Sequence, residues 1–205
     1  MTAPLRLRLD KGALSANWRW LQAQSGQAAC GAAVKANGYG LGAPEVVQHL
    51  LAAGCRDFFV ATWAEAAEIE SFLPQEASLS VLHGVREEDT PQALASRARP
   101  VLNTAQQVAR WRSTGKPCDV MLDTGMNRLG LAPGDDLSGL TIHTLMSHLA
   151  SADEDVPQNT QQLDLFRSAA ATLRAQRLSL ANSAGICLGA AYHFGLTRPG
   201  LALYG

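Results

Sequence analysis

Short apolar runs alternate with amphipathic segments along most of the chain. Several of these runs are apolar throughout, as expected for strands that are buried on both faces of a parallel sheet. The pattern predicts eight strands, near residues 32–35, 57–62, 79–83, 100–103, 119–123, 143–148, 178–182 and 201–204. Strands that alternate with helices in this way favour the α/β class and a (β/α)8 TIM-like barrel.

Helical periodicity fills the segments between the strands. It predicts helices near residues 11–24, 43–53, 63–73, 104–112 and 158–177. Gly54 is a good stop signal for the second of these helices, and Thr62 is a good N-cap for the third. The link over residues 129–140 is rich in Gly, Pro and Asp, so we expect any helix there to be short.

The length of the chain conflicts with a complete barrel. A barrel of this type takes roughly 250 residues, and this chain has 205. The predicted eighth strand is the last element, so no helix remains to cover it. We therefore expect one domain over residues 1–205, apparently truncated from a longer protein, with a barrel that is incomplete at its last helix.

The composition of the chain argues against nucleic acid and membranes as binding partners. The net charge is −1 and gives no electrostatic footprint for nucleic acid. No run approaches the roughly 20 apolar residues that span a bilayer, and residues 1–10 contain no signal-peptide stretch. The cysteines are scattered without a Cys-x-x-Cys pair, which predicts reduced thiols in a cytoplasmic protein: Cys30, Cys55, Cys118 and Cys187.

Polar residues collect where the predicted strands end, which in a TIM barrel is the reactive face. Lys35 ends the first strand and is one of only three lysines in the chain, with Lys11 and Lys116. Further polar side chains follow the fifth, sixth and seventh strands: Asp123, Arg128, His148, Asn182 and Ser183. Taken singly, a strand-end lysine is more often a solvated charge, and Asn182-Ser183 more often a helix cap.

Together these features suit one cofactor. The loop over residues 36–42 after Lys35 is rich in glycine, which permits close approach of a ligand. Many barrels bind a phosphate between the loops that follow strands seven and eight, where Ser183 and the backbone of Gly200 and Leu201 could donate. A lysine amine beside a phosphate site suits pyridoxal 5'-phosphate, whose aldehyde forms a Schiff base with lysine. NAD is disfavoured because no Gly-x-Gly-x-x-Gly follows the first strand.

Five blocks, in order along the chain, closely resemble the signatures of the alanine racemase family. They are AVKANGYGLG at 33–42, LDTGMNRLG at 122–130, SHLASADE at 147–154, NSA at 182–184 and RPGLALYG at 198–205. The resemblance implies racemisation of L-alanine and D-alanine, with D-alanine supplied for peptidoglycan. It also implies alanine as the small-molecule substrate and a homodimer of the full-length protein.

The resemblance implies a role for each matching residue. Lys35 would bind the cofactor and act as the base at Cα, and Arg128 would sit near the substrate carboxylate. Arg198 would donate a hydrogen bond to the pyridine nitrogen and, because guanidinium stays protonated, leave that nitrogen without a proton. The other implied cofactor-binding residues contact the phosphate or the ring: Tyr39, His148, Asn182, Ser183, Gly200 and Leu201.

Two departures from the family stand out. Many members carry a carbamylated lysine two residues before the aspartate of the Asp-Thr-Gly block, where it positions the arginine; here that residue is Met121. Racemisation also needs a second acid/base group on the other face of Cα. In the family this group is a tyrosine from a C-terminal β domain of the partner subunit. That domain is missing here, so we expect this chain alone to racemise poorly.

Other interpretations remain open. The chain could be a racemase for serine or for a broader range of amino acids, or a single-domain carrier of pyridoxal phosphate without turnover. A third alternative is a decarboxylase of the same fold. Such an enzyme would be expected to have an acidic residue as the partner of the pyridine nitrogen, and this chain has Arg198 at that position. We expect no metal site, take Asp123 as structural and place Asp153 on a solvated loop at the site rim. The remaining histidines are predicted to be structural: His49, His83, His143 and His193.

Overall fold

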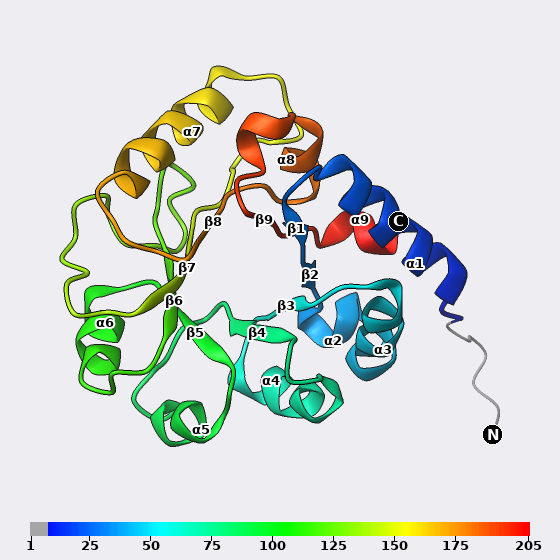
Figure 1. Ribbon diagram of the computed structural model, residues 1–205, viewed down its shortest axis with the longest axis horizontal. Coiled ribbons are helices and arrows are strands. Elements are labelled where there is room, and N and C mark those ends of the chain that lie inside the picture. Colours follow the sequence, from blue (N-terminus) through cyan, green and yellow to red (C-terminus); the bar gives the residue numbers. More distant parts are fainter. Residues whose placement is uncertain (1–7) are drawn as a thin grey trace.

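The computed structural model describes residues 8–205, in which short parallel strands form the wall of a barrel (Figure 1). Helices lie on the outside of this wall, and the strands surround the centre of the view. The strands are β1 (Ala29–Cys30), β2 (Ala32–Ala33), β3 (Asp57–Val60), β4 (Ser78–Val81), β5 (Arg99–Leu102), β6 (Cys118–Met121), β7 (Ile142–Met146), β8 (Arg177–Ser179) and β9 (Leu196–Thr197).

Backbone hydrogen bonds close the barrel. Seven strands form one sheet in the order β2 to β8, and β1 pairs in parallel with β9. Gly31 separates β1 from β2 and donates its N–H to the carbonyl of Thr197 at 2.9 Å. A Cβ at Gly31 would lie 2.9 Å from the carbonyl oxygen of Asp57, so only glycine fits there. On the other side of β9, Gly195 donates to Leu178 at 3.1 Å, which joins the pair to the strand β8.

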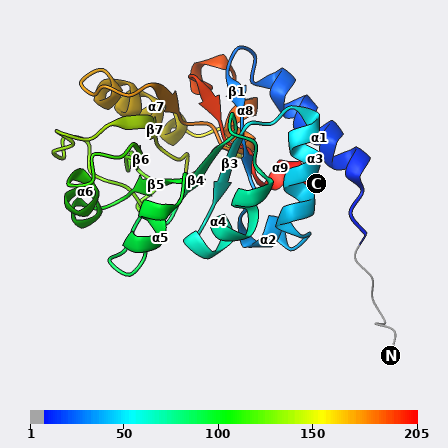
Figure 2. The same cartoon turned by 60° about the horizontal axis from the view of Figure 1, so that its bottom comes forward.

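Helices cover the outside of the strands and fill most of the links between them. They are α1 (Lys11–Gln24), α2 (Lys35–Tyr39), α3 (Ala43–Ala53), α4 (Trp63–Ile69), α5 (Thr90–Ala95), α6 (Ala105–Arg112), α7 (Pro157–Ala170), α8 (Ser183–Cys187) and α9 (Leu201–Tyr204). Two 3-10 turns, η1 (Glu70–Phe72) and η2 (Ala190–Tyr192), add to these. The helices α1 and α3 pack side by side on the outside of the barrel (Figure 2). In residues 8–205, no helix is both long and apolar enough to cross a membrane.

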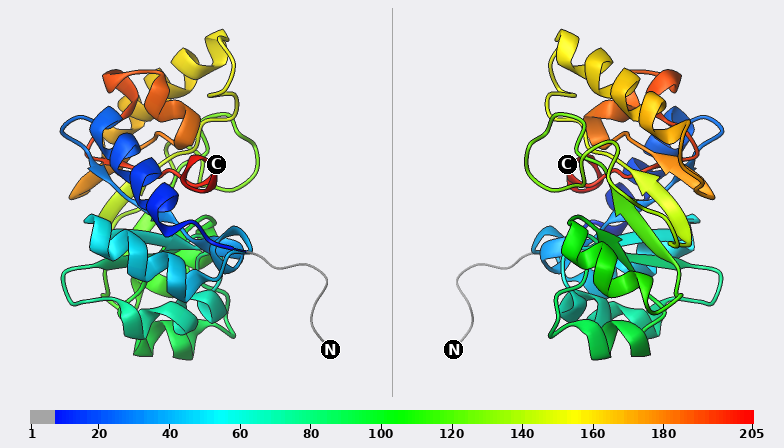
Figure 3. Two further views of the ribbon diagram at one scale, coloured as in Figure 1. Left: turned by 90° about the vertical axis from the view of Figure 1, so that its right-hand side faces the viewer. Right: turned by 90° about the vertical axis from the view of Figure 1, so that its left-hand side faces the viewer.

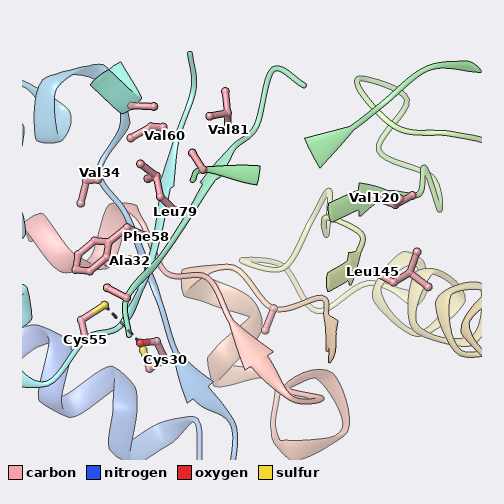
Figure 4. Close-up of a cluster of buried hydrophobic side chains, with 14 of the residues drawn as sticks. Cys30, Ala32, Val34, Cys55, Phe58, Val60, Leu79, Val81, Val120 and Leu145 are labelled. Atoms are coloured by element: carbon pink, nitrogen blue, oxygen red, sulfur yellow. Dashed lines mark hydrogen bonds between the residues drawn. The ribbon is translucent and has the colours of Figure 1, made fainter. Parts of the chain in front are cut away.

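Alternate residues of each strand face two different apolar layers. One set packs outward under the helices, where Figure 4 shows Ala32, Phe58, Val60 and Leu79 close together. The intervening residues point into the barrel and form a second cluster: Ala33, Phe59, Val101, Met121, Met146 and Leu196. This alternation follows from the two-residue period of a strand. After β2 the chain leads through Val34 into α2, whose first residue is Lys35.

Charged residues fill the barrel interior near the starts of the strands. Asp119 is fully buried and accepts hydrogen bonds from Ser80 Oγ at 2.5 Å, Thr144 N at 3.0 Å and Arg99 Nε at 3.2 Å. Polar groups at the N-terminal end of a TIM barrel ordinarily serve stability. The network therefore forms a polar floor beneath the inner apolar cluster.

The sequence predicted this architecture with two errors in the strands. The apolar run at residues 201–204 is the helix α9 rather than a strand, and the eighth strand is the shorter Leu196–Thr197. Lys35 begins α2 rather than ending a strand. The predicted helices at 11–24 and 43–53 match α1 and α3 residue for residue. The helix predicted for 158–177 ends earlier, at Ala170, because Arg177 begins β8.

Candidate active site

One pocket of about 580 Å³ opens at the C-terminal ends of the strands. The loop after β6 and the helix α9 lie at this same end of the molecule (Figure 3). All nine residues that the sequence singled out as catalytic or cofactor-binding line this pocket: Lys35, Tyr39, Arg128, His148, Asn182, Ser183, Arg198, Gly200 and Leu201. Residues from distant parts of the chain are thus brought together around one space.

Lys35 enters the pocket from an unusual piece of backbone. The residues after it adopt left-handed angles, with φ of 52° at Ala36, 54° at Asn37 and 63° at Gly38. Such angles cost roughly 1–2 kcal/mol for each residue that carries a Cβ. The turn is held by Asn37, whose Oδ1 accepts from Ala43 N at 2.8 Å and whose carbonyl accepts from Gly42 N at 2.9 Å. Backbone strain of this kind is typical of ligand-binding positions.

The amine of Lys35 differs from the other lysine amines in having no partner within the part of the chain that the structure describes. Lys11 pairs with Glu45 at 3.0 Å, and Lys116 donates to the carbonyl of Leu94. Within residues 8–205, Lys35 makes neither a hydrogen bond nor an ion pair, and its side chain lines the pocket. An amine in this setting is available to a carbonyl group of a ligand.

His148 is held neutral. Burial lowers its pKa to about 3, and nearby positive charges act in the same direction. These charges belong to Arg198, Arg128 and Lys35, in decreasing order of effect. At neutral pH the imidazole is therefore an uncharged ring on the pocket wall.

Arg198 is buried and has no carboxylate within ion-pair distance among the described residues. Its side chain donates from Nη1 to Ser179 Oγ and from Nη2 to the carbonyl of Ser147 at 2.5 Å. Burial lowers its pKa to about 10, although the charge of Asp119 opposes this shift. The guanidinium thus remains positive at neutral pH. In the described part of the chain its Nε has no acceptor, so this N–H can donate to a ligand at the pocket.

Arg128 lies on a loop that is shaped by Asp123. One carboxylate oxygen of Asp123 accepts from the backbone N–H of Gly125 at 2.9 Å, Met126 at 3.0 Å and Asn127 at 3.1 Å. Asp123 therefore has a structural role, as the sequence predicted, and that role is to cap this turn. Arg128 itself is exposed to the pocket and has no ion-pair partner in residues 8–205.

Met121 stands two residues before Asp123, at the first of the two departures noted in the sequence. Its side chain is buried in the inner apolar cluster and lines the pocket. The thioether supplies no charge that could orient Arg128. No hydrogen bond or ion pair among residues 8–205 orients the Arg128 side chain, so any support for it acts through its loop.

A cradle for an anion lies where β9 meets α9. Ser183 Oγ accepts from Gly200 N at 3.0 Å and from Ala202 N at 3.2 Å. A Cβ at Gly200 would lie 2.4 Å from Tyr39 Oη, so the bare backbone approaches this hydroxyl closely. Burial raises the pKa of Tyr39, which keeps its hydroxyl protonated and able to donate. Because Ser183 Oγ occupies the N–H groups of Gly200 and Ala202, the hydroxyl protons of Ser183 and Tyr39 remain as donors in this small space, and such donors suit a phosphate group.

Two aromatic rings and one amide support the cradle. Tyr39 stacks on Tyr204 with ring centroids 4.6 Å apart. Tyr204 in turn donates from its hydroxyl to the carbonyl of Ala33 at 2.9 Å. Asn182 caps α8 by accepting from Gly185 N at 2.8 Å, so its side chain is engaged in the cap as well as lining the pocket.

Several pocket residues were not singled out from the sequence. His83 was predicted to be structural, yet it lines the pocket beside Thr62. It lies two residues after the end of β4, just as His148 lies two residues after the end of β7, a signal that was available in the sequence. Asp153 lines the pocket as well, in keeping with the rim position predicted for it.

The charges of the pocket favour an anionic ligand. Lys35, Arg128 and Arg198 supply three positive groups, whereas Asp153 is the one carboxylate among the residues that line the pocket. A free amine beside a phosphate-sized cradle suits a phosphorylated carbonyl compound. A second anionic group, such as a carboxylate, would complement Arg128.

Comparison with known proteins gives consistent similarities. The family profile described as "Alanine racemase, N-terminal domain" matches residues 9–205. The chain is 44% identical over 219 residues to "Alanine racemase, biosynthetic" of Agrobacterium fabrum, an alignment that covers 99% of this chain and 56% of the relative. It is 45% identical over 216 residues to "Alanine racemase" of Rhodospirillum rubrum, covering 97% and 58%. The chain thus spans a little over half the length of these relatives.

Solved structures share the fold over nearly the whole chain. The alanine racemase of Bartonella henselae, described with covalently bound pyridoxal phosphate, superposes with a TM-score of 0.90 at 34% identity and covers 96% of this chain and 59% of that one. The biosynthetic alanine racemase of Pseudomonas aeruginosa gives a TM-score of 0.84 at 33% identity, with 95% and 57% covered.

Proposed function

The chain belongs to the alanine racemase family, and from this premise we propose that it binds pyridoxal 5'-phosphate through Lys35 as the barrel part of an enzyme that interconverts L-alanine and D-alanine. The observation that carries the proposal is the amine of Lys35, which has no partner among the described residues and shares its pocket with the Ser183–Gly200 cradle and Arg198.

The pocket residues fit the cofactor group by group. Gly200, where a Cβ would collide with Tyr39, lets the Tyr39 hydroxyl lie against the backbone near Ser183, and these two hydroxyls can donate to a phosphate. The unused Nε of Arg198 suits the ring nitrogen, and the neutral ring of His148 suits the flat face of an aromatic ligand.

When bound, the cofactor supplies an electron-withdrawing ring that stabilises negative charge at Cα of the amino acid. Lys35 holds the cofactor and, once the amino acid has taken its place, removes or returns the proton at Cα on one face. Arg198 donates to the ring nitrogen without giving up a proton, since its pKa of about 10 keeps it charged. Arg128 binds the carboxylate of the amino acid.

Racemisation also needs proton transfer on the opposite face of Cα. We assign this role to a tyrosine in the part of the relatives that this chain does not span, contributed by the partner subunit of a homodimer. We propose that the whole protein works in the cytoplasm and supplies D-alanine for peptidoglycan.

Exchange of the Cα proton in deuterated water tests the function. The chain loaded with pyridoxal phosphate should exchange the Cα proton of one alanine enantiomer, and Lys35→Ala should abolish this exchange. Lys116→Ala, which removes a lysine far from the pocket, should leave it unchanged. Exchange with serine but not with alanine would indicate a different racemase. Cofactor uptake without exchange of either amino acid would indicate a carrier and contradict the proposal.

A further inference from the structure

Three amide side chains on α7 face the loops that carry Arg128 and His148. Gln158, Asn159 and Gln162 occupy positions i, i+1 and i+4 of the helix, which places them on one side. Asn159 and Gln162 are almost completely buried. We call these three residues the amide clamp. None of them lines the pocket, so they are candidates for positioning rather than for ligand contact.

Gln162 binds both loops with one side chain. Its Oε1 accepts from the backbone N–H of Ala150 at 2.8 Å, and its Nε2 donates to the carbonyl of His148 at 3.0 Å. The same Nε2 lies 3.4 Å from Thr124 Oγ1, on the loop that leads to Arg128. Thr124 and Ser147 are themselves joined by a hydrogen bond of 2.7 Å between their hydroxyls. The amide of Gln162 thus links the two loops near their origins.

The other members of the clamp reinforce this link. Gln158 donates to the carbonyl of Gly125 at 3.2 Å and accepts from Ser151 Oγ at 2.9 Å, so it also joins the two loops. Asn159 donates to the carbonyls of Ser151 at 3.0 Å and Glu154 at 2.8 Å, which orders the second loop alone.

We propose that Gln162, assisted by Gln158, is the positioning residue that fixes Arg128 and His148 relative to each other, an inference that rests on the proposed function of the pocket. Met121 offers no polar contact to Arg128 from the barrel interior, so support for its loop comes from the helix side. Neutral amides achieve this without adding a charge beside His148, which the pocket keeps uncharged. Both polar atoms of the buried Gln162 amide have partners, which makes one loop arrangement much more favourable than others.

Amide hydrogen exchange tests the clamp without the cofactor. In Gln162→Leu, the amides of residues 123–130 and 147–154 should exchange about tenfold faster, as expected from the loss of buried hydrogen bonds. The control is Gln161→Leu, the exposed glutamine next to it on the same helix, which should match the unchanged chain. Equal exchange in the two variants would overturn the proposal.

A second variant covers the case in which Gln162→Leu does not fold. Gln158→Leu removes a half-buried amide and should speed exchange in the 123–130 loop, with less effect near His148. Exchange in this loop that equals that of Gln161→Leu would also overturn the proposal.

The effect of the clamp on alanine binding is measured with the chain that carries pyridoxal phosphate. The change in cofactor absorbance on adding alanine should require about tenfold more alanine in Gln162→Leu than in Gln161→Leu, the fold-change that corresponds to one buried hydrogen bond. Faster loop exchange with unchanged alanine affinity would show a purely structural clamp and overturn the positioning role. Failure of the unchanged chain to take up cofactor would instead contradict the proposed function, and the exchange data would still decide whether the clamp orders the loops.

Discussion

The carboxylate of Glu65 accepts a hydrogen bond of 2.8 Å from the backbone N–H of Ala36, the residue that directly follows Lys35. The other carboxylate oxygen of Glu65 accepts from Ala61 N at 2.6 Å. Glu65 also completes a capping box with Thr62 at the start of α4. A single side chain thus ties the left-handed turn after Lys35 to the end of β3.

This relationship predicts that Glu65→Ala releases the turn. Three backbone N–H groups, those of Ala36, Ala61 and Thr62, lose their acceptor. We expect a loss of about 1–3 kcal/mol in the free energy of unfolding and about tenfold weaker uptake of pyridoxal phosphate. Urea unfolding and cofactor titration measure both effects. Glu68→Ala, an exposed substitution on the same helix, should change neither; equal effects from both variants would contradict the assignment.

His148 should remain neutral far below the usual range of histidine. Its pKa of about 3 lies under the ordinary unfolded value of about 6.5. The unfolded chain therefore binds a proton in this interval that the folded chain does not, and stability falls as the pH drops from about 6.5 toward 3. His148→Gln should weaken this acid dependence. Ring nitrogen shifts in NMR that show protonation near pH 6 would contradict the prediction.

Gly200→Ala should damage the anion cradle more than the fold. Its Cβ would lie 2.4 Å from Tyr39 Oη, so the tyrosine must move away from the position proposed for the phosphate. We expect at least tenfold weaker cofactor binding, measured by titration, and a smaller change in melting temperature. Gly195→Ala is the matched control, because its Cβ would meet atoms no closer than 3.7 Å. Unchanged cofactor affinity in Gly200→Ala would remove the cradle from the site.

Asp119→Asn should lower the free energy of unfolding without abolishing cofactor binding in the pocket. Burial raises the pKa of Asp119, but its contacts with His143, Arg99 and Ser80 outweigh burial and hold the pKa below the ordinary value. Breaking such a buried pair costs about 3–5 kcal/mol. Because the folded pKa is depressed, the stabilisation that the substitution removes is present at neutral pH and lost in strong acid. Urea unfolding at pH 7 and pH 3 should therefore show a smaller difference between the two chains at pH 3.

The helices were predictable where local signals agree with packing. Asp10 caps α1 through Ala13 N at 2.9 Å, and Gly54 ends α3 with a φ of 117°. The eighth strand was not predictable from hydrophobicity, because a four-residue apolar run fits a strand or a buried helical turn equally well. The left-handed turn after Lys35 was equally hidden, since Ala36 has no intrinsic preference for that conformation.

The residues that line the pocket were easier to predict from the sequence than the residues that hold its loops in place. Lys35, His148 and Ser183 stand directly after or near strand ends, so the barrel topology alone brings them together. Gln162 and Glu65 lie inside helices, where the sequence shows only polar residues on an amphipathic segment. Both side chains form hydrogen bonds with backbone groups of loops. Such hydrogen bonds can be identified only when the three-dimensional course of the loops is known.

The most direct test of the account uses the fact that the chain has only three lysines, Lys11, Lys35 and Lys116. Borohydride reduction of the chain loaded with pyridoxal phosphate fixes the cofactor to whichever amine holds it, and peptide mass mapping then locates the label. We expect a stoichiometric label on Lys35 and none in Lys35→Ala. A label on Lys11 or Lys116, or uptake that survives in Lys35→Ala, would contradict it.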